Sequence, residues 1–390
     1  MADSTAQLEN DAALNVLLDG DPARLPMARL GAALVARGHN VFVLDAPKVV
    51  QDMQDEFDAP ATLLQSLPSW LGRFRTKKTL ALAHSHHIDI VHILTVGPRQ
   101  AVWTEPGAPP FVITVAAADL TSGNSERSAA QDSTVDTLMS MAGAVTADSQ
   151  PVLRRAINRM AANPAPRAQV LWGSDLSTFD RDLQREQTAR FREQLQIDPD
   201  VPVLMSPRPP LTPYHVDRII AAFHVSDWCK RGVLVIKRQG KRGEGNYVNF
   251  MLSLARQRRI DDRVRIAPRA TEDELPSLLA LADAAVSLPV TDGVPRTFLE
   301  LMALQVPILG WNLPAYEGIV VSGERGGILA GLGDQGGIID GINLCLHDVE
   351  KRRALGAAGR TWVLEHGDWG KSVQRWIGMY RGAMAQRGAG

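Results

Sequence analysis

Short apolar runs alternate with amphipathic helical stretches from Leu14 through most of the chain. Runs of aliphatic and β-branched residues without polar alternation are typical of strands buried on both faces of a parallel sheet. Such runs lie at residues 15–18, 41–44, 90–93, 111–115, 144–147 and 169–171, and again at 201–205, 233–236, 264–266, 284–288, 307–309 and 327–329. The sequence therefore predicts an α/β protein built from doubly wound, Rossmann-like sheets.

A highly charged stretch at 177–200 interrupts this alternation and predicts a boundary between two domains. A chain of 390 residues is long enough to bury two separate cores. We expect one Rossmann-like domain over 1–177 and another over 178–371, facing one another across a ligand-binding cleft. The last helical stretch, about 372–390, places apolar residues at spacings of three and four, so it could pack back on the N-terminal domain.

The charge balance and the cysteine content exclude several classes of protein. The chain has 42 Lys and Arg against 43 Asp and Glu, a formal net charge of −1 that does not suit a nucleic-acid partner. Two cysteines cannot form a disulfide framework or a four-cysteine zinc site. The histidines at 84, 86, 87 and 92 have only Asp89 as a nearby carboxylate, so we expect no metal site.

The start of the chain carries no apolar signal, and no run approaches the length of about 18 apolar residues that a membrane span requires. We therefore expect a cytoplasmic protein, with peripheral contact at the inner membrane face as an open option.

The segment 288–303 combines a strand end, a glycine-containing loop and a helix start. The predicted strand ends at Leu288, and the helix opens near Thr297, whose hydroxyl can cap it. The backbone from Gly293 to Thr297 would present N–H groups and the positive end of a helix dipole to a phosphate. Asp292 and Glu300 could then accept hydrogen bonds from sugar and ribose hydroxyls. The alternative is an ordinary capped turn with two solvated acids.

This segment resembles the acidic pair of the retaining glycosyltransferases of the GT-B fold, in particular glycosyltransferase family 4 (group 1). That family shows an acid, seven residues, a Glu, a Met-Ala turn and a strand that begins with Pro. Asp292, Glu300, Met302, Ala303 and Pro307 stand at those places. Further segments follow in the order that the family shows, at residues 37–39, 89–92, 147–149, 172–175, 206–208 and 274–283.

The resemblance implies transfer of a hexose-type sugar, with retention, from a UDP- or GDP-linked donor to an acceptor hydroxyl, without a metal or another cofactor. Asp292 would contact the hexose, Glu300 the ribose, and Arg208 would neutralise the diphosphate as it leaves. Further donor contacts would come from Gly293, Val294, Pro295, Arg296, Thr297, Pro268 and Arg269.

The N-terminal domain would bind the acceptor, which could be a glycan, a lipid-linked molecule or a small molecule. Asp119 is the acid nearest to the position of an acceptor-side catalytic group. Gly20 is a further candidate for donor binding, in the loop where the family places paired glycines close to the diphosphate or the acceptor, but here it stands between two acids, Asp19 and Asp21.

Two further positions depart from the family pattern. Residues 116–119 lack the usual His, and residues 209–215 lack a Lys that normally follows Arg208. Arg296, Lys237 or Arg238 could supply the missing cation. These departures leave two alternatives open, namely a non-catalytic GT-B-fold protein that binds a nucleotide, a glycan or an active partner, and a sugar-nucleotide epimerase.

Two basic segments allow more than one interpretation. Residues 70–78 mix Trp70 and Phe74 with four cations, which could bind an anionic membrane or a lipid-diphosphate acceptor. A solvated helix face whose aromatic side chains point into the core is the alternative. The glycine-rich loop at 237–245 could close over the donor phosphates, although its pattern is too loose for a nucleotide fingerprint.

Overall fold

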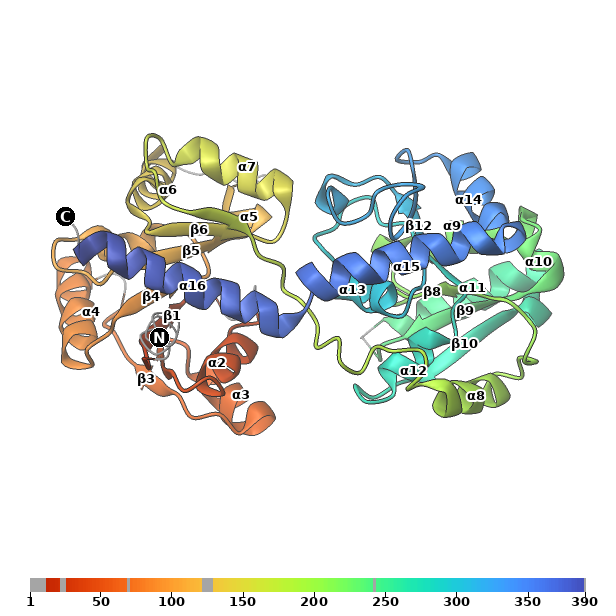
Figure 1. Cartoon of the computed structure of the whole chain (residues 1–390), viewed down its shortest axis with the longest axis horizontal. Helices are drawn as coiled ribbons and strands as arrows, with labels where there is room; N and C mark the ends of the chain where they lie inside the picture. Colours follow the sequence, from red (N-terminus) through yellow and green to blue (C-terminus); the bar gives the residue numbers. More distant parts are fainter. Residues whose placement is uncertain (1–11, 22–25, 69–70, 121–128, 241–242, 389–390) are drawn as a thin grey trace, which may run out of the picture. The chain divides into compact units, whose positions relative to one another are not determined.

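The computed structural model describes residues 12–21, 26–68, 71–120, 129–240 and 243–388. The chain divides into two compact units (Figure 1). Unit 1 comprises Met1–Val170 and Ser372–Gly390, and unit 2 comprises Leu171–Lys371. Within the described residues, no helix combines the length and the apolar character needed to cross a membrane.

Unit 1 is a parallel sheet of seven strands in the order β3-β2-β1-β4-β5-β6-β7. Its strands are β1 (Asn15–Asp19), β2 (Asn40–Leu44), β3 (Thr62–Leu64), β4 (Ile90–Ile93), β5 (Phe111–Val115), β6 (Ala144–Ala147) and β7 (Arg167–Gln169). Its helices are α2 (Met27–Val35), α3 (Pro47–Phe57), α4 (Arg73–Ser85), η3 (Pro98–Thr104), α5 (Ala117–Leu120), α6 (Ala129–Met141), α7 (Gln150–Arg159) and most of α16 (Trp369–Gly388).

Unit 2 is a parallel sheet of six strands in the order β10-β9-β8-β11-β12-β13. Its strands are β8 (Val203–Ser206), β9 (Val233–Arg238), β10 (Val264–Arg269), β11 (Ala284–Ser287), β12 (Ile308–Trp311) and β13 (Gly327–Ala330). Its helices are α8 (Arg185–Gln194), η4 (Thr212–Tyr214), α9 (Val216–Val225), α10 (Trp228–Arg231), α11 (Glu244–Gln257), η5 (Asp261–Arg263), α12 (Leu275–Ala280), α13 (Arg296–Ala303), η6 (Pro314–Tyr316), α14 (Gln335–His347) and α15 (Val349–His366).

The apolar runs that were expected to form strands lie in the central strands of both sheets. Every residue of β4, β5 and β6 in unit 1, and of β8, β11 and β12 in unit 2, is buried. Burial on both faces is what a parallel sheet covered by helices requires. The predicted doubly wound, Rossmann-like fold class is therefore confirmed for both sheets.

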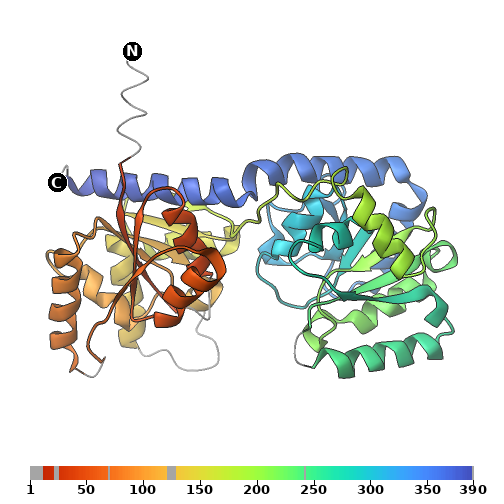
Figure 2. The same ribbon diagram turned by 90° about the horizontal axis from the view of Figure 1, so that it is seen from below.

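The last helix, α16, packs on unit 1 through its apolar face (Figure 2). Val373, Trp376 and Tyr380 are fully buried. Beneath the helix, His92 of β4 hydrogen-bonds to the Tyr380 hydroxyl at 2.7 Å and to Thr114 Oγ1 of β5 at 2.7 Å. Burial lowers the pKa of His92 to about 3, so the ring is neutral and one of its nitrogens accepts a hydrogen bond.

The chain from Leu171 to Ser177, which the sequence analysis assigned to the N-terminal domain, belongs to unit 2. Ser174 forms a parallel bridge with Asp368, because its N–H donates to Gly367 O and its carbonyl accepts from Trp369 N. A Cβ on Gly173 would lie 2.3 Å from Gly367 O, so only glycine allows this close approach. The bridge fixes the position of the Ser174 side chain, which contacts Glu300.

Candidate functional site

The chain order reverses between two neighbouring strands of unit 2. From β8 the chain builds β9 and β10 on one side, and it then returns to place β11, β12 and β13 on the other. The loops that follow β8 and β11 diverge at such a point and leave a crevice at the carboxyl edge of the sheet, where open α/β sheets bind ligands. Arg208 follows β8 and Asp292 lies in the loop after β11, so both candidates stand at this position.

Arg208, Asp292 and two tyrosines form one cluster there. Arg208 Nη2 lies 3.2 Å from Asp292 Oδ1, and the Tyr316 hydroxyl donates to Asp292 Oδ2 at 3.0 Å. The guanidinium carbon of Arg208 lies over the Tyr214 ring, 4.4 Å from its centroid, in a cation–π contact. Burial raises the pKa of Asp292, while the Arg208 charge and the Tyr316 hydrogen bond oppose this shift. The alternative of a solvated acid is therefore wrong for Asp292, whose side chain is 13% exposed.

Buried polar atoms without a partner gather at this same edge. Among the described residues, six buried side-chain nitrogen or oxygen atoms lack a hydrogen bond, and five of them lie here: Ser206 Oγ, Arg208 Nε, Arg238 Nε, Ser287 Oγ and Trp311 Nε1. Four of these residues end the strands β8, β9, β11 and β12. Leaving such an atom unpaired costs about 1–3 kcal/mol, so a concentration of them marks an edge where water or a polar ligand can supply the missing partners.

Helix α13 begins at Arg296, one residue earlier than expected. Its N-cap is Pro295, without a side-chain cap hydrogen bond, so the predicted capping role of Thr297 is wrong. Gly293 has open space at its Cβ position. Together with Val294, these residues lead from Asp292 into the helix, as expected for a loop that could face a phosphate.

Glu300 is buried one turn inside α13, with 3% of its surface exposed. Ser174 Oγ donates to Glu300 Oε1 at 2.9 Å, and Arg296 Nη2 lies 3.5 Å from the same oxygen. Arg296 Nε also points to Ser174 Oγ at 3.4 Å. Glu300 is thus held by two side chains rather than solvated, and Ser174 is a site residue for which the sequence analysis assigned no role.

The loop after β9 is fixed from within. The Glu244 carboxylate, 1% exposed, accepts the N–H groups of Gln239 at 3.0 Å and Gly240 at 2.8 Å. Gly240 has a positive φ of 76°, and a Cβ there would lie 3.1 Å from Arg269 Cδ. Lys237 is buried at 3% exposure. Pro268 and Arg269 end the neighbouring strand β10, and residues 241–242 of the loop lie outside the described part of the chain.

Two candidate residues, Asp119 and Gly20, belong to unit 1. Asp119 is fully buried, and its Oδ2 accepts the N–H of Ala116 at 2.9 Å, so its carboxylate closes the turn between β5 and α5. A Cβ on Gly20 would lie 2.9 Å from Leu94 Cβ, so this glycine allows β1 and β4 to approach. Residues 121–124, a further polar loop considered for the acceptor, lie outside the described residues.

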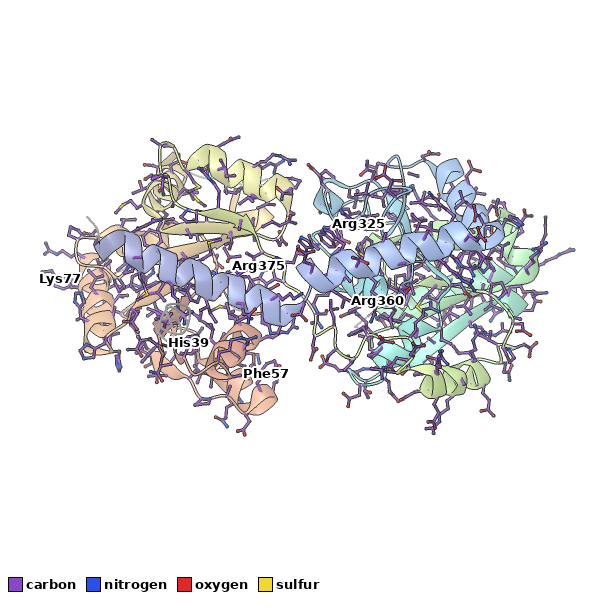
Figure 3. All side chains as sticks on the ribbon, viewed as in Figure 1. His39, Phe57, Lys77, Arg325, Arg360 and Arg375 are labelled. Atoms are coloured by element: carbon purple, nitrogen blue, oxygen red, sulfur yellow. The ribbon has the colours of Figure 1, made fainter. Side chains whose placement is uncertain are left out.

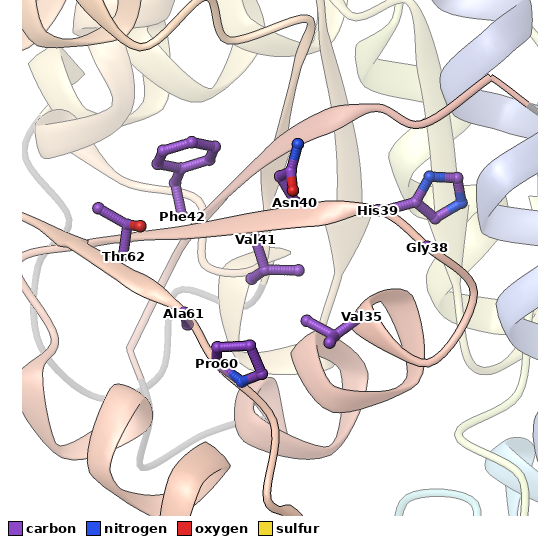
Figure 4. A pocket seen from close by; sticks show the side chains of 9 residues that line it. All are labelled: Val35, Gly38, His39, Asn40, Val41, Phe42, Pro60, Ala61 and Thr62. Carbon is purple, nitrogen blue, oxygen red and sulfur yellow. The ribbon is translucent and has the colours of Figure 1, made fainter.

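A cavity of ≈ 390 Å³ in unit 1 lies away from these positions (Figure 4). It is lined by residues at the amino ends of β2 and β3, including His39, Asn40 and Thr62. Open α/β sheets bind ligands at the opposite edge, so we assign this cavity no role in the site. Over the described ranges, no three His, Cys, Asp or Glu side chains are arranged to hold a metal ion.

The solved structures that resemble this chain share its fold. A glycosyltransferase from Rickettsia africae has a TM-score of 0.77 at 14% identity and covers 95% of this chain and 99% of its own. Anabaena HepE, solved in complex with UDP, has a TM-score of 0.74 at 16% identity, with 94% and 99% covered. Together with the two parallel Rossmann-like sheets, this similarity defines a GT-B fold.

The comparison with families is more specific. The model of the family "Glycosyl transferases group 1" matches residues 189–362, which lie within unit 2. A GDP-mannose-dependent alpha-(1-6)-phosphatidylinositol monomannoside mannosyltransferase of Mycobacterium tuberculosis is 28% identical over 153 residues. That alignment covers 37% of this chain and 39% of the relative's length.

The contribution of the hydrogen bond from Tyr316 to Asp292 can be tested by mutation, with a more exposed Tyr–Asp pair as the control. Tyr316→Phe should lower the free energy of unfolding by about 1–3 kcal/mol, because it leaves a mostly buried carboxylate with one partner fewer. The control is Tyr247→Phe, which removes a hydrogen bond of 3.0 Å to Asp217 at a half-buried position. This variant should lower the free energy of unfolding by less than about 1 kcal/mol. Urea unfolding of both variants measures the difference, and equal costs would contradict the role given to Tyr316.

Proposed function

We propose that this protein is a metal-independent, retaining glycosyltransferase that moves a hexose-type sugar from a nucleoside-diphosphate sugar to an acceptor hydroxyl. The observation that carries the proposal is the group of five buried polar atoms without a hydrogen bond at the carboxyl edge of unit 2, together with the Arg208–Asp292 pair beside them. One of the five, Arg238 Nε, also lies 3.8 Å from Glu244 Oε2. A fixed cation beside unpaired donors suits the phosphate oxygens of a donor. The match of residues 189–362 to the model of group 1 glycosyltransferases supports the same assignment.

In this reaction the bond between the anomeric carbon and the phosphate oxygen breaks, a bond to the acceptor oxygen forms, and the acceptor hydroxyl loses its proton. Negative charge grows on the departing diphosphate. Arg208, already positioned by Asp292 and Tyr214, would stabilise that charge without reorganising. The amino end of α13 would receive the distal phosphate. Because these groups supply the positive charge, the proposal needs no metal ion.

Asp292 would contact the hexose hydroxyls and Glu300 the ribose. The contacts of Glu300 with Ser174 and Arg296 support this assignment, since they hold the carboxylate at the start of the helix. Pro268 and Arg269 would lie beside the base, and Lys237 near the phosphates. Asp119 is proposed only as an acceptor-side group, and Gly20 as a loop contact in the same unit.

The nucleoside of the donor is proposed to be uridine or guanosine. A GDP-mannose-dependent relative and a HepE structure with bound UDP support these two candidates. We further propose a cytoplasmic protein whose acceptor is a glycan, a lipid-linked molecule or a small molecule, with peripheral contact at the inner membrane face around residues 71–78. Trp70, which also belonged to that prediction, lies outside the described residues.

The proposal predicts stabilisation by one nucleoside diphosphate. UDP or GDP at about 100 times its dissociation constant should stabilise the protein by about 2.7 kcal/mol, which corresponds to several degrees in the melting temperature. The shift should be the same with Mg²⁺ and with EDTA. Thermal unfolding with UDP, GDP, ADP, TDP and CMP measures it, and the free nucleosides serve as controls because they lack the phosphates.

No shift with any nucleotide would contradict donor binding and favour the non-catalytic alternative. A shift that disappears with EDTA would contradict the metal-independent mechanism. Transfer from the matching sugar nucleotide, followed by analysis of the anomeric configuration of the first product, tests retention.

A further inference from the structure

Helix α4 exposes one continuous face on unit 1. Successive helix residues turn by about 100°, so exposed residues at 73, 74, 77, 78, 81, 84 and 85 share one side of the helix. Phe74 lies near the middle of this side and is 56% exposed. Arg73 and Lys77 flank it on one side and Lys78 on the other. The expectation that Phe74 points into the core is wrong.

The opposite face of α4 attaches the helix to unit 1. Arg75 has 9% of its side chain exposed and pairs with Asp45 Oδ2 at 3.2 Å. Thr79 and Ala83 are buried below it. Of the four cations at 73–78, one is therefore structural, and Arg73, Lys77 and Lys78 remain on the outer face. Figure 3 labels Lys77 on this helix.

No acidic residue stands near these cations in the sequence. Between Asp58 and Asp89 the chain contains no Asp or Glu. Arg73 lies over the Phe74 ring, with 5.3 Å between the guanidinium carbon and the ring centroid. The Arg side chain can thus cover the ring in water and extend toward a charged surface once the ring is inserted.

We propose that the outer face of α4 binds the surface of an anionic lipid bilayer, with Phe74 inserted among the headgroups and Arg73, Lys77 and Lys78 against the lipid phosphates. An exposed ring surrounded by cations on an acid-free helix fits this partner, because apolar insertion and electrostatic attraction act together there. The surface gives a specific site to the peripheral contact proposed above. It rests on that part of the proposed function and is independent of sugar transfer.

Phe57 provides a contrast within the same unit. It is 42% exposed at the end of α3 (Figure 3), but its helix also carries Asp52, Asp55 and Glu56. An anionic bilayer would repel that surface. Phe57 is therefore a matched aromatic control for Phe74.

The test is binding of the full chain to vesicles, without nucleotide or acceptor. The wild-type protein should sediment with phosphatidylcholine vesicles that contain about 30% phosphatidylglycerol, and not with pure phosphatidylcholine. The double variant Lys77→Gln, Lys78→Gln should weaken binding about thirtyfold, because each cation near the membrane surface contributes about 1 kcal/mol. Phe74→Ser should weaken it about tenfold, while Phe57→Ser should leave it unchanged.

The charge control is the pair Arg185→Gln with Arg190→Gln on α8, whose side chains are 79% and 72% exposed. It lowers the net charge of the chain by the same amount and should leave vesicle binding unchanged. All substituted side chains are exposed, so folding should be preserved, and circular dichroism checks this.

The proposal would be overturned if the wild type did not bind the anionic vesicles, or if the α8 control lost as much vesicle binding as the Lys77→Gln, Lys78→Gln variant. Full vesicle binding by Phe74→Ser, together with equal affinity of the protein for RNA, would also overturn it, because this would indicate a general polyanion surface. Nucleotide-induced stabilisation is measured without lipid. Failure of vesicle binding therefore stays distinguishable from failure of the proposed transferase activity.

Discussion

Arg208→Ala should lower kcat/KM for sugar transfer by about a thousandfold and abolish the thermal stabilisation by the nucleoside diphosphate. Arg208 is the cation at the point where the order of the unit 2 strands reverses, and its Nε is buried without a partner. Removing it would take away the group that we propose to stabilise the leaving diphosphate. It also leaves the carboxylate of Asp292 buried without its cation, which adds a cost in stability.

Arg352→Ala is the matched control. This arginine of α15 also pairs with an aspartate of unit 2, with its Nη2 3.6 Å from Asp283 Oδ1 and its side chain 16% exposed, but Asp283 precedes β11 and so lies at the opposite edge of the sheet. Its loss should change kcat/KM by no more than a few-fold. Steady-state kinetics with the nucleotide sugar, together with calorimetric binding of UDP and GDP, measure both variants. An Arg208→Ala enzyme within tenfold of the wild type would refute the assigned role.

The second large effect is acid destabilisation through His92. In the folded protein burial lowers the pKa of His92 to about 3, whereas in the unfolded chain it returns to 6.5. As the pH falls below 6.5, the unfolded chain therefore binds a proton at His92 that the folded protein does not bind. The contribution of His92 is complete above that pH and should be lost at about 1.4 kcal/mol per pH unit as the pH falls towards 3.

Between pH 6.5 and about pH 5 this amounts to about 2 kcal/mol. Burial also lowers the pKa of His39, so the wild-type slope has more than one source, and the difference from His92→Gln isolates the effect. Tyr380→Phe is the control, because it removes the 2.7 Å hydrogen bond but keeps the buried ring and hence the slope. Urea unfolding at several pH values checks this, and equal slopes in wild type and His92→Gln would contradict it.

The central strands could be predicted because burial on both faces leaves little choice of residue. The strands at the edges of the sheets were harder to predict. Thr62–Leu64 was missed, since three residues at the end of a sheet carry no recognisable pattern. The last strand of unit 1 was expected at 169–171 and lies at Arg167–Gln169, because the apolar residues Val170 and Leu171 follow the edge strand instead of forming it.

The site was predictable where topology determines it. Arg208 and Asp292 come together because the carboxyl ends of β8 and β11 are neighbours. Tyr316 was missed, since it reaches Asp292 from a 3₁₀ turn after β12, and a hydrogen bond of that kind depends on a loop path with no sequence signal. The contact between Ser174 and Glu300 spans 126 residues and follows from the bridge at Asp368, which spacing along the chain cannot reveal.

At the serines that end β8 and β11, the residue that would favour stability differs from the residue that would favour ligand binding. Alanine at Ser206 or Ser287 would remove a buried hydroxyl that has no partner in the described structure, and it would fit the same space. Selection for a durable scaffold alone would favour that exchange. A programme of thermostabilisation would therefore find easy gains at the edge where the protein is proposed to hold its donor, and each gain there would remove a hydroxyl that is proposed to face the donor.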